Sequence, residues 1–182
     1  MTAAGRTGVA LRAGRLGSLL AAAAACAVMA AAIIVLTPRP VTQMAVPVSY
    51  QGDLVKLRRI APYPVLAPRG LPAGWQPVSS RLDASPGGAV SWHLGYVTPS
   101  GLMASLEESS ERPAPFILRM TNNGNAAPRL WSGGQWWARR WRPDKNQRSM
   151  YRSAPGAFTI VVTGTSGWAE LSVLASSLAT QP

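Results

Sequence analysis

Hydrophobic residues run without a charge from Leu16 to Thr37, between Arg15 and Pro38. An α-helix of this length extends for about 33 Å, which is enough to cross a hydrocarbon layer of roughly 30 Å. We therefore predict a transmembrane helix over residues 16–37. Beyond it the hydrophobic pattern breaks into short periods, which predict the elements of a small folded domain.

Residues 51–61 repeat their apolar positions at helical spacing and predict a short amphipathic helix with a buried face of Leu54, Leu57 and Ala61. We expect Ser49 as its N-cap, Asp53 in its first turn, and prolines to end it. The preceding residues 38–50 have three prolines and no helical period. They predict an extended linker or a first short strand.

Strict alternation over residues 90–97 predicts a strand whose inner face carries Val90, Trp92, Leu94 and Tyr96. A turn at residues 98–101 leads back into a second strand, Leu102–Glu107, and the two form a hairpin. Further strands are expected at residues 63–66, 76–82, 136–141, 148–152 and 158–163, the last of them central.

Two more helices are expected. Pro113 suits the first position of one, which has an apolar stripe of Phe116, Ile117 and Met120 and ends at Asn123-Gly124. Ser166 is the expected cap of the other, whose buried face is Trp168, Leu171, Leu174, Ala175 and Leu178. Because short turns join most strands, we predict an α+β domain over residues 51–182, with a mostly antiparallel sheet and two or three packed helices.

The charges around the apolar segment predict its orientation. Arg6, Arg12 and Arg15 precede it, one arginine lies close behind it, and no acidic residue occurs before Asp53. The positive-inside rule then makes residues 1–15 a cytoplasmic tail and places the C-terminal domain outside the membrane. The predicted location is the cell membrane, with a single pass.

Three other interpretations of the apolar segment fit its pattern less well. A cleaved signal peptide has an apolar core of roughly 7–15 residues before small residues, but this run is longer, and Ile33–Leu36 follow the small residues Ala30–Ala32. A lipoprotein would use Cys26, yet the apolar run continues past it. A buried globular helix would not usually stay uncharged for so long. We favour the uncleaved membrane helix.

Composition removes several classes of function. Cys26 is the only cysteine, so the predicted outer domain can hold neither a disulfide nor a cysteine-based zinc site. The net charge is +11, and residues 38–182 carry fifteen Lys and Arg against seven Asp and Glu, a net charge of +8. Such a surface attracts anionic lipid, anionic wall polymer or an acidic protein. The predicted export of the domain excludes nucleic acid as its partner.

Catalytic motifs are weak. His93, the only histidine, lacks the partners of a metal site, and we expect a structural or surface role for it rather than that of a general base. Glu107 and Glu108 are adjacent, so on a strand they would point to opposite sides. With Glu111 and Asp83 they could serve a hydrolase only if two of them converged. The loop 163–167 is expected to be a strand-to-helix turn, and no cofactor is expected.

The run WSGGQWWARRWR at residues 131–142 is the most unusual part of the domain. A regular strand would place Trp137, Arg139 and Trp141 on one face and Trp136, Arg140 and Arg142 on the other. Tryptophan faces bind sugars and stack with cations, so these six residues are a possible interaction surface. The alternative is that one face is core and the arginines are solvated or stacked on it.

Three segments resemble those of a known family: LPAGW at residues 71–75, VSWHLGYVTPSG at 90–101 and VVTGTSGWAELSVLASSL at 161–178. They are similar to the signature segments of an uncharacterised actinobacterial family of single-pass membrane proteins with an extracytoplasmic domain of unknown function. The resemblance implies an envelope location and supplies no catalytic residues. By analogy it also implies a small α/β sandwich of the Mog1/PsbP type.

The sequence thus favours a membrane-anchored, extracytoplasmic binding or scaffolding module of the bacterial cell envelope over an enzyme. Two alternatives stay open. One is an envelope hydrolase acting through Glu107, Glu108 or Asp83, and the other is a regulatory partner of another membrane protein that binds through the Trp and Arg run.

Overall fold

The computed structural model describes residues 46–84, 87–154 and 158–181. The predicted cytoplasmic tail 1–15, the predicted transmembrane helix 16–37 and most of the predicted linker 38–50 lie outside these residues. No helix in the described ranges is both long enough and apolar enough to cross a membrane.

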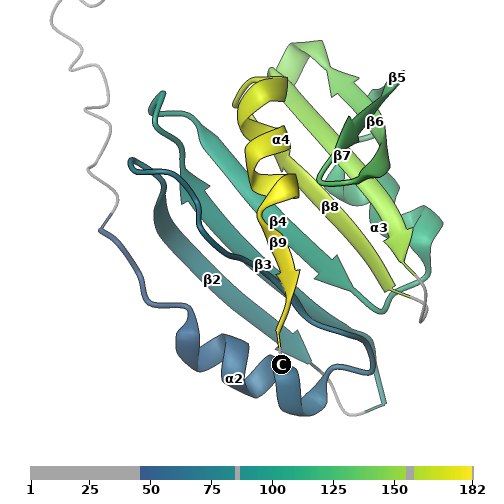
Figure 1. Cartoon of the computed structure of the whole chain (residues 1–182). Coiled ribbons are helices and arrows are strands. Elements are labelled where there is room, and N and C mark those ends of the chain that lie inside the picture. Colours follow the sequence, from purple (N-terminus) through teal and green to yellow (C-terminus); the bar gives the residue numbers. More distant parts are fainter. Residues whose placement is uncertain (1–45, 85–86, 155–157, 182) are drawn as a thin grey trace, which may run out of the picture. The chain divides into compact units, whose positions relative to one another are not determined.

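Seven strands form one sheet in the order β2-β3-β4-β8-β7-β6-β5, and every neighbouring pair is antiparallel (Figure 1). These strands are β2 (Gln76–Ala84), β3 (Val90–Val97), β4 (Met103–Ser109), β5 (Asn125–Ser132), β6 (Gln135–Arg142), β7 (Gln147–Ala154) and β8 (Phe158–Gly164). A second, two-stranded antiparallel sheet pairs β1 (Leu66–Pro68) with β9 (Leu178–Thr180). The helices are α2 (Gln51–Ile60), α3 (Pro113–Met120) and α4 (Trp168–Ser176), with a 3-10 turn η1 at Pro143–Lys145. The predicted α+β class and antiparallel sheet are confirmed.

The best patterned segments fold as predicted. Helix α2 buries Leu54 and Leu57 and carries Asp53 in its first turn. Strand β3 has the predicted bounds, its expected inner residues are all buried, and it forms a hairpin with β4. Strand β8 is buried on both faces and lies fourth of seven in the sheet, so the expected central strand is confirmed.

Both predicted serine caps are wrong. The N-cap of α2 is Tyr50 rather than Ser49, and the N-cap of α4 is Gly167 rather than Ser166; no side chain caps either helix. The Ser166 side chain is buried instead. In both helices an acid in the first turn, Asp53 or Glu170, interacts favourably with the helix dipole.

Other boundaries also differ from prediction. The first strand begins at Leu66 rather than Tyr63. Leu102 lies in the turn before β4 and is 40% exposed. Helix α3 starts at Pro113 as expected but ends at Met120, before two left-handed asparagines. Strand β5 was not predicted, because Pro128 and a register shift interrupt its alternation; as an edge strand it tolerates both. Strand β9 was missed because Leu178 continues the helical spacing of α4.

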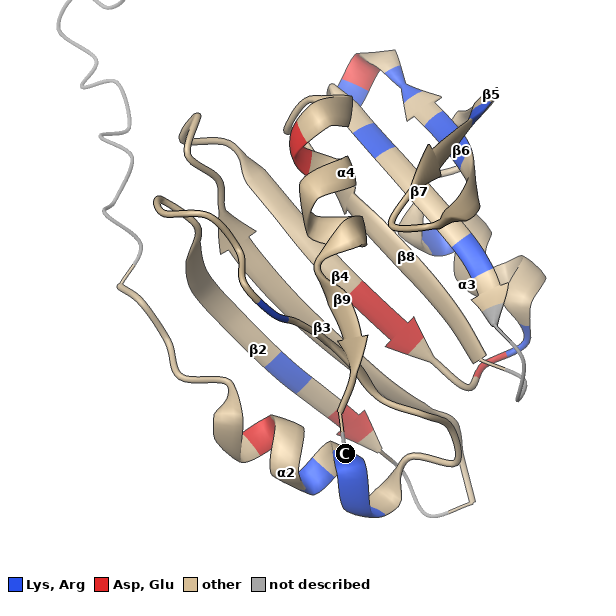
Figure 2. Cartoon of the chain, in the orientation of Figure 1, with Lys and Arg blue, Asp and Glu red and all other residues tan. Residues whose placement is uncertain are grey.

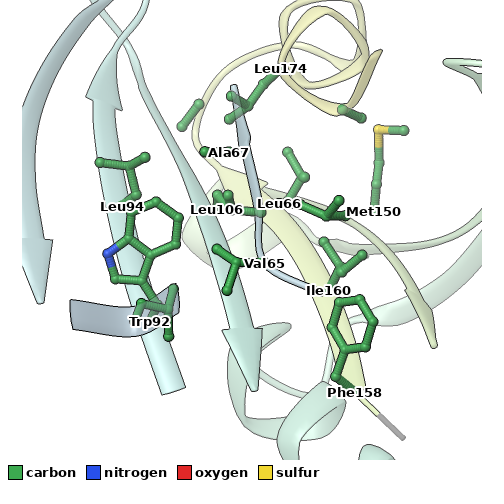
Figure 3. Packing of buried hydrophobic residues seen from close by; sticks show 14 of the residues in the cluster. Val65, Leu66, Ala67, Trp92, Leu94, Leu106, Met150, Phe158, Ile160 and Leu174 are labelled. Carbon is green, nitrogen blue, oxygen red and sulfur yellow. The ribbon is translucent and has the colours of Figure 1, made fainter. Parts of the chain in front are cut away.

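One face of the large sheet carries the main core. Helix α2, helix α4 and the β1–β9 pair cover this face (Figure 1), and the helices and strands meet in one apolar cluster. Figure 3 shows its centre, where β1 lies over side chains of β3, β4, β7 and β8: Trp92, Leu94, Leu106, Met150, Phe158 and Ile160. We call this the apolar face.

The opposite face is rich in hydroxyl groups. The strand register places there Ser79, Ser91, Ser105, Ser109, Ser149, Thr159 and Thr163, together with His93 and Glu107. Helix α3 contacts β7 and β8, and Phe116 and Val161 are buried apart from the main cluster. We call this the hydroxyl face.

Candidate functional site

The β5–β6 hairpin presents two exposed tryptophans. Trp131 and Trp136 are directly paired across the hairpin, and their rings meet edge to face with centroids 5.4 Å apart. Both side chains are more than half exposed, at 56% and 53%. The guanidinium of Arg129 lies 5.8 Å from the centre of the Trp136 ring. We call these three residues the tryptophan platform.

The other side of this hairpin is fixed to the domain. Trp137 is fully buried, and its indole N–H donates a hydrogen bond to the carbonyl of Ser132 over 3.2 Å. The Ser132 hydroxyl in turn donates to the carbonyl of Ser172 in α4 over 3.0 Å. The tryptophan platform is therefore held on a docked hairpin.

The other aromatic and basic residues of the predicted interaction surface make contacts inside the domain. Arg139 stacks 4.4 Å over the ring of Trp168, and Arg148 stacks 4.2 Å over Trp141. Arg140 donates to the carbonyl of Gly124 over 2.8 Å, and Arg142 pairs with Asp144 at 2.6 Å. Figure 2 shows that several of the basic residues lie on β6 and β7.

On the hydroxyl face, His93 has partners on both sides. Its Nδ1 lies 2.7 Å from the Glu107 carboxylate on β4, and its Nε2 lies 2.9 Å from the hydroxyl of Ser79 on β2. The Ser105 hydroxyl donates a further hydrogen bond to Glu107 over 2.9 Å. Three neighbouring strands thus align a serine, a histidine and a glutamate, which we call the Ser79–His93–Glu107 relay.

A cavity of about 220 Å³ between the sheet and α3 adjoins the histidine and the glutamate of the relay, and Ser79 is not among the residues that line it. His93 and Glu107 line it together with Phe116 and Met120 of α3 and with charged side chains: Arg81, Asp83, Glu111 and Arg119. Arg119 donates to Glu111 over 2.6 Å, and this hydrogen bond lowers the pKa of the Glu111 carboxyl.

The predicted acids are divided between the two faces. Glu107 lies on the hydroxyl face, whereas Glu108 is fully buried on the apolar face, as the alternation of a strand requires. Both carboxyl oxygens of Glu108 accept the backbone N–H of Leu66, the shorter contact being 3.1 Å. Burial raises the pKa of Glu108 well above its usual range. Its hydrogen bond with Leu66 joins β1 to the sheet.

A wider groove of about 460 Å³ lies beside the C-terminal end of α2. Arg58, Arg59, Tyr63 and Gln181 line it with apolar side chains. It brings together no acid with a base or nucleophile, so it offers less chemistry than the relay.

Sequence reasoning found two members of the relay without joining them, and it missed Ser79. His93 was expected in a structural or surface role, and Glu107 was considered only with other acids. The β3–β4 hairpin contained the signal that joins His93 to Glu107, since residues equally distant from its turn face each other. The loop 163–167 is the predicted strand-to-helix turn, between the end of β8 and the N-cap of α4. In the described part of the chain, no group of three or more His, Cys, Asp or Glu side chains could hold a metal ion.

A protein-family model described as a protein of unknown function, DUF4245, matches residues 14–178. No curated protein and no solved structure matches the chain. The match covers most of the sequence, including the three segments that suggested an uncharacterised family. The chain belongs to the DUF4245 family.

Proposed function

We propose that the chain is a single-pass membrane protein whose outer domain binds an anionic, sugar-containing polymer of the cell envelope through the tryptophan platform. Residues 16–37 would anchor it in the lipid bilayer, with the tail 1–15 in the cytoplasm. The envelope location, the actinobacterial source and the Mog1/PsbP type of sandwich are expectations that the family resemblance implies.

The exposed tryptophan pair is the observation that carries the proposal. An indole ring offers a flat apolar surface to the C–H side of a sugar ring, and Arg129 adds a positive charge beside it. The two adjacent indole rings, each more than half exposed, form a contiguous apolar surface of the kind found at contact sites. The net charge of +8 over residues 38–182 attracts a negatively charged polymer.

The binding test uses the full chain and three soluble polymers in affinity electrophoresis: polygalacturonate, neutral dextran and poly-glutamate. We expect retardation by polygalacturonate, weakened by salt because part of the attraction is electrostatic. Changing Trp131 and Trp136 to Ser should weaken it at least about tenfold, since aromatic stacking contributes about 1–3 kcal/mol per ring with other flat partners. The Leu118→Ser variant is the matched control, because Leu118 is 41% exposed on α3.

Equal retardation by poly-glutamate would show charge alone and contradict sugar recognition. Equal binding by the tryptophan variant would exclude the platform as the contact surface. If the chain binds none of the polymers, and a membrane protein co-purifies with the wild type but not with the tryptophan variant, the domain is instead a regulatory partner of that protein.

The topology has its own test. Protease added to intact cells should degrade the C-terminal domain while a cytoplasmic control protein survives. Survival of the domain beside that control, together with its loss after lysis, would place it in the cytoplasm.

A further inference from the structure

The Ser79–His93–Glu107 relay is arranged as a nucleophile, a base and an orienting carboxylate. We propose that it is a catalytic site for acyl transfer, in which Ser79 attacks a short-chain carboxylic ester. This activity goes beyond polymer binding, uses different residues and lies on different strands. It differs from the alternative of a hydrolase acting through carboxylates, because here Glu107 orients the histidine and does not act on the substrate directly.

The two contacts of His93 fix its role. With the proton on Nδ1 donated to the Glu107 carboxylate, Nε2 is free to accept the proton of Ser79. The distances of 2.7 Å and 2.9 Å both lie within hydrogen-bond reach, as a nucleophile and its base require. Ser105 holds Glu107 from the side, so the carboxylate cannot easily turn away.

The backbone makes room for the contact between Ser79 and His93. Gly95 lies opposite Ser79, and a Cβ at this position would overlap the Ser79 hydroxyl and lie 3.2 Å from His93 Nε2. The register of β2 also shifts between Pro77 and Ser79. Such bulges occur beside active sites, where they redirect a side chain. A glycine and a bulge therefore both serve the same serine–histidine pair.

The surroundings indicate the substrate class. The His93 side chain is 32% exposed and that of Glu107 is 13% exposed, so the base is reachable while its orienting group is shielded. The adjoining cavity of about 220 Å³ has an apolar wall of Phe116 and Met120. This volume suits a short acyl chain. Arg81 lies directly across from His93 on the same face, where it pairs with Asp83 over 2.9 Å.

The reaction balances without a cofactor. The Ser79 oxygen bonds to the acyl carbon, its proton passes to His93 Nε2, and the ester C–O bond breaks as the alcohol takes that proton. Water then attacks the acyl-serine, gives one proton to His93 and releases the carboxylic acid as Ser79 recovers its hydrogen. Ester and water become acid and alcohol.

The test is covalent labelling of the purified full chain with a fluorophosphonate probe, followed by peptide mass spectrometry. We expect one adduct, on Ser79, and none in Ser79→Ala. His93→Gln should slow labelling roughly hundredfold, the lower end of the range for a general base. The control is Ser153→Ala, which changes an exposed serine on β7 and should label like the wild type. A wild-type chain that gives no Ser79 adduct under conditions that label a known serine hydrolase overturns the proposal.

Glu107, as the positioning residue, needs a readout that a structural role would not change. Glu107→Gln can donate to Nδ1 and favour the wrong tautomer, so the labelling rate should fall and its pH profile should change, whereas Glu107→Asp should restore part of it. Hydrolysis of p-nitrophenyl acetate should exceed that of p-nitrophenyl octanoate. An unchanged pH profile in Glu107→Gln, or faster hydrolysis of the octanoate, contradicts the assignment.

Discussion

The two faces of the seven-stranded sheet are built on different principles. On the apolar face, side chains from α2, α4 and β1 pack against the strands and exclude water. On the hydroxyl face, short polar side chains form hydrogen bonds to each other, and α3 packs against β7 and β8. Glu107 and Glu108 show the difference directly. The first pairs with a histidine beside a cavity, and the second is buried against a backbone N–H, where burial raises its pKa.

This division explains how a small domain can hold reactive groups without weakening its core. Packing on the apolar face supplies most of the stability, because burying apolar area is the dominant favourable contribution to folding. The hydroxyl face is then free to arrange polar groups whose individual net contributions are only about 0.5–1.5 kcal/mol. Substitutions on the two faces should therefore have different effects.

The largest difference should come from two adjacent residues of β4. Leu106 is fully buried on the apolar face, so Leu106→Ala should lower the free energy of unfolding by about 2–5 kcal/mol. Ser105→Ala removes hydrogen bonds on the hydroxyl face and should cost about 1 kcal/mol. Urea unfolding followed by tryptophan fluorescence measures both. Equal losses of unfolding free energy would mean that the two faces contribute equally to stability.

Two strand glycines give a second contrast. A Cβ at Gly164 would overlap the Met103 carbonyl oxygen and lie 2.8 Å from Ala104 Cα, so β4 and β8 would have to separate. We expect Gly164→Ala to destabilise the fold by about 1–3 kcal/mol. A Cβ at Gly95 meets only rotatable side chains, so Gly95→Ala should cost less than about 1 kcal/mol and still separate Ser79 from His93.

Thermal unfolding gives the stability of each glycine variant, and NMR of the His93 ring nitrogens reports the contact with Ser79. An unchanged His93 spectrum in Gly95→Ala would show that the glycine does not make room for the relay. Similar melting temperatures for the two variants would show that it does not matter whether the new Cβ meets side chains, as at Gly95, or backbone, as at Gly164.

A third contrast concerns pH and Glu108. Because its pKa is higher in the folded chain than in the unfolded chain, its contribution to stability is fully present below the unfolded value of about 4.3. That contribution is lost as the pH rises towards the folded value. Glu108→Gln should remove this loss, so its stability relative to the wild type should increase with pH, by at most about 1.4 kcal/mol per unit.

Urea unfolding at pH 4.5, 6 and 7.5 provides the comparison, with Asp83→Asn as an exposed control whose side chain is 62% accessible. Parallel pH curves for wild type and Glu108→Gln would show that the buried carboxyl is not the source of the pH dependence.

The spacing of hydrophobic residues predicted the parts of the fold in which burial alone decides the structure. Strand β3, strand β8 and the buried side of α2 fall into this class. Strand β5 does not, because an edge position and pairing with β6 keep it extended despite Pro128. The serine caps failed because serine only favours a cap, and both helices begin without a side-chain hydrogen bond.

The relay shows where sequence reasoning reaches its limit. Counting outward from the turn of the β3–β4 hairpin pairs His93 with Glu107, so this half could have been predicted. Ser79 could not, because the bulge in β2 shifts its register by one residue and no local pattern marks that shift. The tryptophan run was noticed from composition, but the exposed partner of Trp136 is Trp131, which only the pairing of the missed strand β5 identifies.

The middle place of β8 has a consequence for how the chain is made. Its residues, Phe158–Gly164, are synthesised after both of the strands they join, so β4 and β7 emerge with free edges and must wait for them. A ribosome-bound chain halted before Phe158 would expose two half-sheets with unsatisfied backbone groups, which are sites for aggregation. If the domain is exported as proposed, folding would be completed only after nearly the whole polypeptide had crossed the membrane, with the anchor already in place.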